Sequence, residues 1–398
     1  MANRLKNILA DFFQQADLLL LGLCCISTLY GIVLIFSATR FFMDTAKIIR
    51  YVGVQSAAMG IGICAYIFMS MLDIENVMKK WKWLVLFNIV FIGLLQTGLG
   101  VGRDTGNVAW LKFPGIPFQI GPAEVVKISF TLLLAKQLEW LREEKQDLKS
   151  FRAALFVAGH TLALMGWYVI ISGDMGNALT FFFIFLCMAF AAGFALRWFI
   201  LLFTGIGGAV AAVLALDLVP QSMEYMVNRF RVLFDHSYDP QGVGWQQTRS
   251  LLAIGSGGAF GQGYMNGTQS QSTYPGSLPK RWTDFIFSVC GEELGLVGCL
   301  LIILLLMAII FRVLLIAKRS QTHFHSYICV GMAAMLIYQT IINIGMCLFV
   351  MPTIGITLPF FSYGGSSIVT LYTAMGVVSN IKKRTLSMER RGRISYHV

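Results

Sequence analysis

Residues 294–311 read LGLVGCLLIILLLMAIIF, eighteen consecutive positions without a charged side chain. About twenty mostly apolar residues in a helix are enough to cross the hydrocarbon core of a bilayer. Apolar residues continue on both sides of this stretch, so we predict one membrane-spanning helix over 285–317. The stretch therefore indicates an integral membrane protein.

The composition of the whole chain agrees with this prediction. Of the 398 residues, 57% are hydrophobic and only 13% are charged, whereas soluble chains are about 45–50% apolar and about 25% charged. These values exclude a soluble enzyme and a disordered chain. The net charge is +11, but the lysines and arginines lie in short clusters between apolar runs, as topology signals do in membrane proteins. We therefore expect no nucleic-acid partner.

Apolar runs of spanning length recur along the chain and predict an all-α polytopic membrane protein. About ten spans are expected, over 17–38, 51–72, 82–101, 121–140, 153–172, 175–193, 197–217, 285–317, 325–351 and 362–381. The distribution of basic residues between the loops predicts that both termini are cytoplasmic. The expected organisation is a single integral membrane domain over 1–381 and a basic cytoplasmic tail over 382–398.

A long polar segment over about 218–284 separates the seventh and eighth spans and is expected outside the cell. It is rich in Gly, Gln, Ser and Tyr, and long loops without periodic structure are usually functional or disordered. Its many aromatic residues favour a packed, functional loop. The Gly-rich stretch 254–261 is similar to a phosphate loop in composition only, because it lacks the Gly-Lys-Ser/Thr ending, so nucleotide binding is not expected.

The cysteines and histidines do not predict a metal site. All eight cysteines lie inside apolar stretches, so we interpret them as small buried hydrophobic side chains rather than disulfides or ligands. His323 and His325 share a predicted inner loop without a third ligand, and a metal site there is not expected.

Charged residues at the ends of the predicted spans are costly in a membrane and require a partner or a function. Asp284 stands at the outer start of the eighth span, where it is either a helix N-cap or a functional carboxylate. Glu292 and Glu293 lie about two turns deeper, and we expect them to hold neighbouring helices through hydrogen bonds.

A second group surrounds the outer start of the fourth span. Glu124 and Lys127 are three residues apart on one helical face, so they form a neutralising pair or leave Lys127 to bind an anion. The preceding outer loop carries Arg103 and Trp110. Asp174 lies in a Gly-Asp-Met-Gly turn, and turn chemistry alone explains an aspartate there.

These residues predict an outer site in which carboxylates and cations converge: Asp284, Glu124, Arg103, Lys127, Arg249 and Arg281. A site of this kind at headgroup depth suits an amphiphile with a charged head, such as a polyprenyl phosphate sugar. No nucleotide energy is available outside the cell, so a lipid that carries its own leaving group is a suitable substrate. Composition alone leaves a transporter open.

Several motifs resemble one bacterial family. They are Asn343-Ile-Gly345, Leu358-Pro-Phe-Phe-Ser-Tyr-Gly-Gly-Ser-Ser367, Arg249-Ser-Leu-Leu-Ala-Ile-Gly-Ser-Gly-Gly258, Asn266-Gly-Thr-Gln-Ser-Gln271, Thr283-Asp-Phe-Ile-Phe287 and Glu292-Glu-Leu-Gly295. In this order they resemble the SEDS family (shape, elongation, division and sporulation), which includes RodA-like and FtsW-like proteins. The resemblance runs from the first predicted span to the tenth.

This resemblance implies an inverting peptidoglycan glycosyltransferase that polymerises lipid II at the outer face of the bacterial cytoplasmic membrane. It implies a class B penicillin-binding transpeptidase as partner, and the polyprenyl pyrophosphate-linked glycan as second substrate. Asp284 matches the family's catalytic carboxylate and would act as general base, a role typically worth about 10²–10⁴-fold. The leaving pyrophosphate would be neutralised by Lys127, Arg103, a loop arginine or a divalent cation such as Mg or Mn.

The expected substrate-binding residues are Glu124, Lys127, Arg103, Trp110, Arg249, Asp174 and Ser366. The chain departs from the family pattern just before Asp284, where Lys280 and Trp282 replace a common acidic residue and a histidine. Its short tails and Asp73 favour the RodA-like branch, which serves cell-wall elongation and shape. The division or sporulation paralogue, a lipid II flippase and a non-catalytic scaffold remain alternatives.

Overall fold

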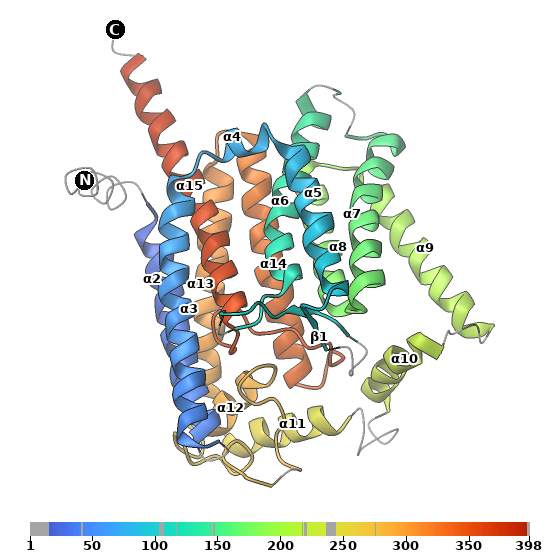
Figure 1. The fold of residues 1–398 in the computed structure, drawn as a ribbon. Coiled ribbons are helices and arrows are strands. Elements are labelled where there is room, and N and C mark those ends of the chain that lie inside the picture. The colour runs from blue at the N-terminus through green and yellow to red at the C-terminus, as the bar shows by residue number, and fades with distance from the viewer. Residues whose placement is uncertain are drawn as a thin grey trace.

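The computed structural model describes residues 16–40, 43–102, 107–116, 118–143, 145, 148–216, 218, 221–235, 244–274 and 276–395. Helices dominate this part of the chain (Figure 1). They are α2 (Leu18–Arg40), α3 (Thr45–Met71), α4 (Ile74–Met78), α5 (Trp81–Gly93), η1 (Leu94–Gln96), α6 (Pro122–Glu143), α7 (Phe151–Ser172), α8 (Met175–Ala192), α9 (Leu196–Ala215), α10 (Gln221–Phe234), α11 (Trp245–Gly257), α12 (Ile286–Glu293), α13 (Gly295–Arg319), α14 (His323–Cys347) and α15 (Gly365–Ser395). Strands β1 (Gly100–Val101) and β2 (Trp110–Leu111) pair antiparallel. The predicted all-α polytopic fold is confirmed.

The predicted spans can be compared with the helices one by one. Among the described residues, seven helices are long and apolar enough to cross a membrane: α2, α3, α7, α8, α9, α13 and α14. The other three predicted spans correspond to α5, which has only 13 residues, and to α6 and α15, which carry more polar and charged side chains. Helix α15 also continues from the last predicted span into the basic tail without a break.

The prediction of one helix over 285–317 is wrong, because the chain breaks between α12 and α13. Gly295 has a φ of +65°, a region that only glycine occupies without cost. A Cβ on Gly295 would lie 2.3 Å from the backbone nitrogen of Gly261. Close backbone packing against the loop at Gly258 and Gly261 therefore determines the break.

This packing also satisfies the backbone groups that the break leaves without a partner in the helix. The carbonyls of Glu292 and Glu293 accept hydrogen bonds from the amides of Gln262 and Gly263. The amide of Leu296 donates to the carbonyl of Gly258 at 3.0 Å. The Gly-rich stretch that is similar to a phosphate loop is therefore a docking segment for the broken helix.

The helices form a bundle with α14 near its centre and α9 leaning away from it (Figure 1). Helix α2 begins and α15 ends at one end of this bundle, which we call the terminal end. Helices α10, α11 and α12 lie at the opposite end, which we call the loop end. The described part of the predicted outer loop thus contains the helices α10 and α11.

Ion pairs and a hydrogen bond to Asp17, just before α2, join four helices at the terminal end. The carboxylate of Asp17 is fully buried and accepts from Arg312 of α13 at 2.8 and 3.2 Å. The ammonium of Lys382 in α15 lies 3.4 Å from the same carboxylate. Tyr66 of α3 donates to the Asp17 carbonyl at 2.8 Å. This network fixes α2, α3, α13 and α15 against one another.

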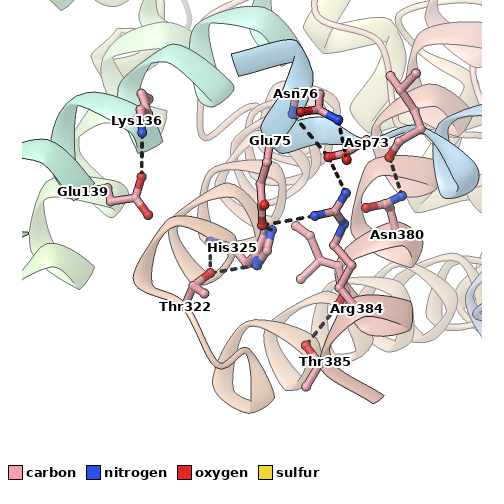
Figure 2. Close-up of polar contacts among 12 residues, drawn as sticks. Asp73, Glu75, Asn76, Lys136, Glu139, Thr322, His325, Asn380, Arg384 and Thr385 are labelled. Atoms are coloured by element: carbon pink, nitrogen blue, oxygen red, sulfur yellow. Dashed lines mark hydrogen bonds and ion pairs between the residues drawn. The ribbon is translucent and has the colours of Figure 1, made fainter. Parts of the chain in front are cut away.

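A second polar cluster at the terminal end joins α4 to α14 and α15 (Figure 2). The guanidinium of Arg384 contacts Asp73 at 2.5 Å and Glu75 at 3.1 Å. Glu75 also lies 3.6 Å from the ring nitrogen Nε2 of His325, whose Nδ1 is 2.7 Å from the Thr322 hydroxyl. The charged groups of this cluster have partners within it, so we assign it a structural role.

Candidate functional site

Asp284 lies in the turn that leads into α12 at the loop end. Helix α12 begins at Ile286 after Phe285 and has no side-chain N-cap, so the N-cap interpretation of Asp284 is wrong. Its side chain is 12% exposed, and Oδ2 lies 3.4 Å from the Nζ of Lys280. Lys280 itself has a φ of +44°, a left-handed conformation that is uncommon for a residue with a Cβ. The carboxylate is therefore sheltered and faces a lysine that the turn holds in position.

The backbone around Asp284 is fixed by a neighbouring segment of the chain. Asn343 of α14 donates to the carbonyls of Asp284 and Ile356 at 2.8 and 2.7 Å. The Ser362 hydroxyl donates to the Thr283 carbonyl at 2.7 Å. These contacts position the carboxylate without using its oxygens. Asn343 was visible in the sequence only as part of a motif, and nothing in that motif indicated its contact with Asp284.

Neighbouring polar and charged groups oppose the effect of burial on the pKa of Asp284. Burial raises the pKa of Asp284, while Lys280, Thr283 and Arg229 act to lower it. Arg229 extends from α10 and donates to the carbonyl of Thr353. Gly355 has a φ of +69°, and a Cβ there would lie 4.0 Å from the Asp284 oxygen Oδ2. The site is therefore a carboxylate of raised basicity beside two cations. The sequence offered no signal for Arg229 beyond its place in the long loop.

Asp174 caps the start of α8. Its Oδ1 accepts from the Asn177 amide at 3.1 Å and its Oδ2 from the Asn177 side chain at 2.8 Å. These contacts in the turn are enough to explain why an aspartate stands at position 174. Asp174 also lines a small cavity together with Arg229, Pro352 and Ile354, and Arg229 in turn interacts electrostatically with Asp284.

Glu124 and Lys127 form the neutralising pair, at 2.7 Å and with the Lys127 side chain fully buried. The ring of Trp110 packs over Gly121, within 3.1 Å of where a Cβ would be. The Gly121 amide donates to the Ser366 hydroxyl at 3.2 Å. Four of the predicted substrate-binding residues are thus brought together at the start of α6.

Tyr168 connects this group with α8. Its hydroxyl donates to Asp174 Oδ2 at 3.3 Å, and it interacts electrostatically with Glu124 as well. The residues at the start of α6 and at the start of α8 therefore belong to one polar region at the loop end.

The remaining predicted cations have different positions. Arg103 lies outside the described residues. Arg249 is half-buried on α11 and makes no hydrogen bond or ion pair with another described residue. The expectation that Arg281 converges on the site is wrong, because its guanidinium is buried and donates to the carbonyls of Ser270 and Ser272 and to the Ser277 hydroxyl. The sequence shows only that Arg281 is a basic residue just before the Thr283–Phe287 motif. It does not indicate that its side chain binds the backbone of the outer loop.

Glu292 and Glu293 are fully buried and act through hydrogen bonds, as predicted. Glu293 accepts from the Ser37 hydroxyl of α2 at 2.5 Å, which joins neighbouring helices. Glu292 instead accepts from the amides of Gln269 and Ser270, both at 2.7 Å. Together they fix the outer loop to the broken helix.

The donor atoms around Asp284 do not fit a protein-held divalent cation. No group of three or more His, Cys, Asp or Glu side chains with metal-ligand geometry occurs within the described ranges. The nearest charged group to the Asp284 carboxylate is the ammonium of Lys280. The Mg or Mn ion that the resemblance implies as an option stays a prediction.

Comparisons with known proteins agree with this arrangement. Residues 17–387 match the model of the FtsW, RodA and SpoVE family, described as cell cycle proteins. The chain belongs to this family, which is the SEDS family. It is 32% identical over 390 residues to a probable peptidoglycan glycosyltransferase FtsW from Trichlorobacter lovleyi, with 94% of this chain and 96% of that protein covered.

The chains of two solved structures are also similar to this chain. One belongs to a peptidoglycan synthase complex that coordinates polymerisation and crosslinking, with a TM-score of 0.74, 27% identity, and 93% of this chain and 98% of that chain covered. The other is the rod shape determining protein RodA of Thermus thermophilus, with a TM-score of 0.63, 26% identity, and coverage of 92% and 97%. The SEDS fold therefore extends over nearly the whole chain, which is a multi-pass membrane protein.

Proposed function

We propose that this SEDS protein is a peptidoglycan glycosyltransferase that polymerises lipid II into glycan strands at the outer face of the bacterial cytoplasmic membrane. The observation that carries the proposal is Asp284. Its backbone is held by Asn343 and Ser362, while its sheltered carboxylate faces Lys280. The names of the relatives support the same activity.

In this mechanism Asp284 acts as the general base. It accepts the proton of the sugar 4-hydroxyl of lipid II as that oxygen attacks the anomeric carbon of the growing glycan. The bond from that carbon to the pyrophosphate breaks, and the polyprenyl pyrophosphate leaves with the electron pair. An α-linked donor then gives a β-linked product. The raised pKa of Asp284 suits this role, because a stronger base accepts the proton more readily.

The leaving pyrophosphate requires positive charge. Arg229 and Lys280 are the cations that interact electrostatically with Asp284. The side chain of Arg249 makes no hydrogen bond or ion pair with another described residue, so it is available to the substrate. We assign these residues the electrostatic role. Lys127 is already neutralised by Glu124, so this pair, Trp110, Asp174 and Ser366 shape and position the substrate-binding region, and Arg103 stays a predicted contact.

The orientation follows from the positive-inside rule. The terminal end carries a concentration of basic residues, namely Lys79, Lys80, Lys82, Arg142, Lys318, Arg319, Lys382, Lys383 and Arg384. We therefore place this end and both termini in the cytoplasm, with Asp284 outside. A fusion reporter at either terminus that responds as periplasmic would contradict this placement.

The proposed partner is a class B penicillin-binding transpeptidase, which the similarity to a peptidoglycan synthase complex supports. We propose the elongation branch, which Asp73 favours. Similar proteins carry both FtsW and RodA names. Restoration of rod shape, rather than of septation, in a strain depleted of its own SEDS proteins tests the branch.

The activity itself is tested by lipid II polymerisation with purified full-length protein, with and without the transpeptidase. We expect Asp284→Asn to lose about 10²–10⁴-fold in rate, while the control Asp73→Asn at the terminal end keeps the parent rate. If Asp284→Asn polymerises as fast as the parent, the proposed base is wrong. If the parent and Asp284→Asn both translocate labelled lipid II into vesicles and neither polymerises it, a flippase is favoured.

A further inference from the structure

Three aromatic rings from distant parts of the sequence meet beside the Asp284 turn. The ring of Tyr51 at the start of α3 lies 4.5 Å from the ring of Tyr363 and 5.9 Å from that of Trp282, measured between centroids. All three side chains are half-buried rather than enclosed. We call Tyr51, Trp282 and Tyr363 the aromatic platform.

Hydrogen bonds hold the platform in a defined shape. The Tyr363 amide donates to the Trp282 carbonyl at 2.9 Å. Gln55, one turn after Tyr51 on α3, donates to the Ser362 carbonyl at 3.1 Å and accepts from the Gly364 amide at 3.1 Å. The three rings are therefore positioned before any ligand arrives, which lowers the entropic cost of binding.

Two exposed cations lie near the platform in the structure or in the sequence. Arg50 is exposed and interacts electrostatically with Tyr363. Lys280, two residues before Trp282, has 59% of its side chain exposed and lies 3.4 Å from Asp284. Two exposed cations beside these rings suit a ligand that carries an anionic group as well as an apolar face.

Partly exposed Tyr and Trp rings with polar groups around them suit a ligand that has both an apolar and a polar side. A pyranose ring is such a ligand, because its C–H groups form an apolar face and its hydroxyls lie around the edge. An anionic substituent on the sugar would meet Arg50 and Lys280. Trp282 is two residues from Asp284 on the same turn, so a sugar bound here lies next to the proposed base.

We infer that the aromatic platform is a binding subsite for an amino-sugar ring of the glycan, with Trp282 as its central contact. This inference rests on the proposed function, because it names the part of the substrate that lies beside Asp284.

The test uses a lipid-free probe, so that binding is separated from polymerisation. The probe is the tetrasaccharide of alternating N-acetylglucosamine and N-acetylmuramic acid, titrated against full-length protein in nanodiscs by calorimetry. We expect Trp282→Leu to weaken binding by about tenfold and Trp282→Phe, which keeps an aromatic face, to weaken it by less than about threefold. The matched control is Trp83→Leu, which removes a 69% exposed tryptophan of α5 at the terminal end and should leave binding unchanged.

The inference is overturned if Trp282→Leu and the parent bind the tetrasaccharide with equal affinity. It is also overturned if Trp282→Phe loses as much affinity as Trp282→Leu, since the aromatic face of the side chain would then contribute nothing to binding. In lipid II assays, Trp282→Leu should raise KM more than it lowers kcat. Asp284→Asn should still bind the tetrasaccharide. If the parent binds it through Trp282 but never polymerises lipid II, the proposed function fails while the sugar subsite stands.

Discussion

Asp17 and Asp284 are buried carboxylates at opposite ends of the same bundle, and their surroundings differ. Asp17 is fully buried, and its oxygens are occupied by Arg312 and Lys382. The Asp284 carboxylate has an ion pair at 3.4 Å with a lysine whose side chain is 59% exposed. At Asp17 two cations bind the carboxylate in addition to the hydrogen bond from Tyr66 to the backbone carbonyl. At Asp284 Asn343 holds the backbone, and the carboxylate faces one exposed lysine.

This difference separates a structural carboxylate from a reactive one. A carboxylate whose oxygens are already bound by cations cannot accept a further proton without losing those bonds. A carboxylate positioned through its backbone keeps an oxygen available at a defined place. Burial of an aspartate therefore gives a structural residue at one site and a reactive residue at the other. The partners of the carboxylate decide which of the two it is.

The largest expected effect is on the terminal-end network. Arg312→Met leaves the buried Asp17 carboxylate with Lys382 alone, and we expect it to lower the free energy of unfolding by about 3 kcal/mol. Thermal unfolding in detergent measures the change, with Arg319→Met at the end of α13 as the control. The polymerisation rate per folded molecule should not change. A parent-like melting temperature would show that this network does not stabilise the bundle.

A smaller effect is expected where the backbone of Asp284 is held. Asn343→Leu removes the donor to two buried carbonyls, and a small displacement of a catalytic group costs about tenfold or more in kcat. Asn380 of α15 offers a matched control, because it donates to the carbonyls of Ser70 and Leu72 at 2.9 and 2.7 Å. Asn380→Leu should lower stability by a similar amount and leave kcat unchanged.

Asn343 acts as a positioning residue, so the shape of the pH profile distinguishes it from the base. Asn343→Leu should lower the rate across the whole pH range without moving the acid limb. If Asn343→Leu and Asn380→Leu affect kcat equally, the backbone of Asp284 is not held for catalysis.

How far the sequence predicts this molecule depends on the range of the interaction. The spans follow from local apolar runs, and Asp284 and the pair of Glu124 and Lys127 stand out because charge in a membrane is costly. The break at Gly295 is set by backbone contact with Gly261, 34 positions earlier in the chain. One glycine in an apolar run gives no indication of such a contact.

The same limit applies to the site. Lys280 is visible as a departure from the SEDS pattern, but its ion pair with Asp284 depends on a left-handed turn that no short motif specifies. Arg281 and Lys280 are adjacent basic residues in the sequence, yet one binds loop carbonyls and the other faces the carboxylate. Charge type is encoded locally, whereas the direction of the side chain is not.

The smallest expected effect concerns the lysine that faces Asp284. Burial raises the pKa of Asp284 and Lys280 opposes this rise, so Lys280→Gln should raise the pKa further. The base must be deprotonated to act, and a higher pKa moves the acid limb of kcat/KM to higher pH. We expect only a small shift, because Lys280 is exposed and solvent screens its charge.

The pH dependence of kcat/KM at low salt measures this shift, and it should shrink as salt is added. The control is Lys136→Gln, which breaks the ion pair with Glu139 at 3.2 Å. This pair is drawn with the Arg384 cluster of the terminal end (Figure 2). That variant should leave the acid limb in place. An acid limb that stays fixed or moves to lower pH in Lys280→Gln would mean that the limb does not report Asp284. The carboxylate held through its backbone would then not be the group that accepts the proton.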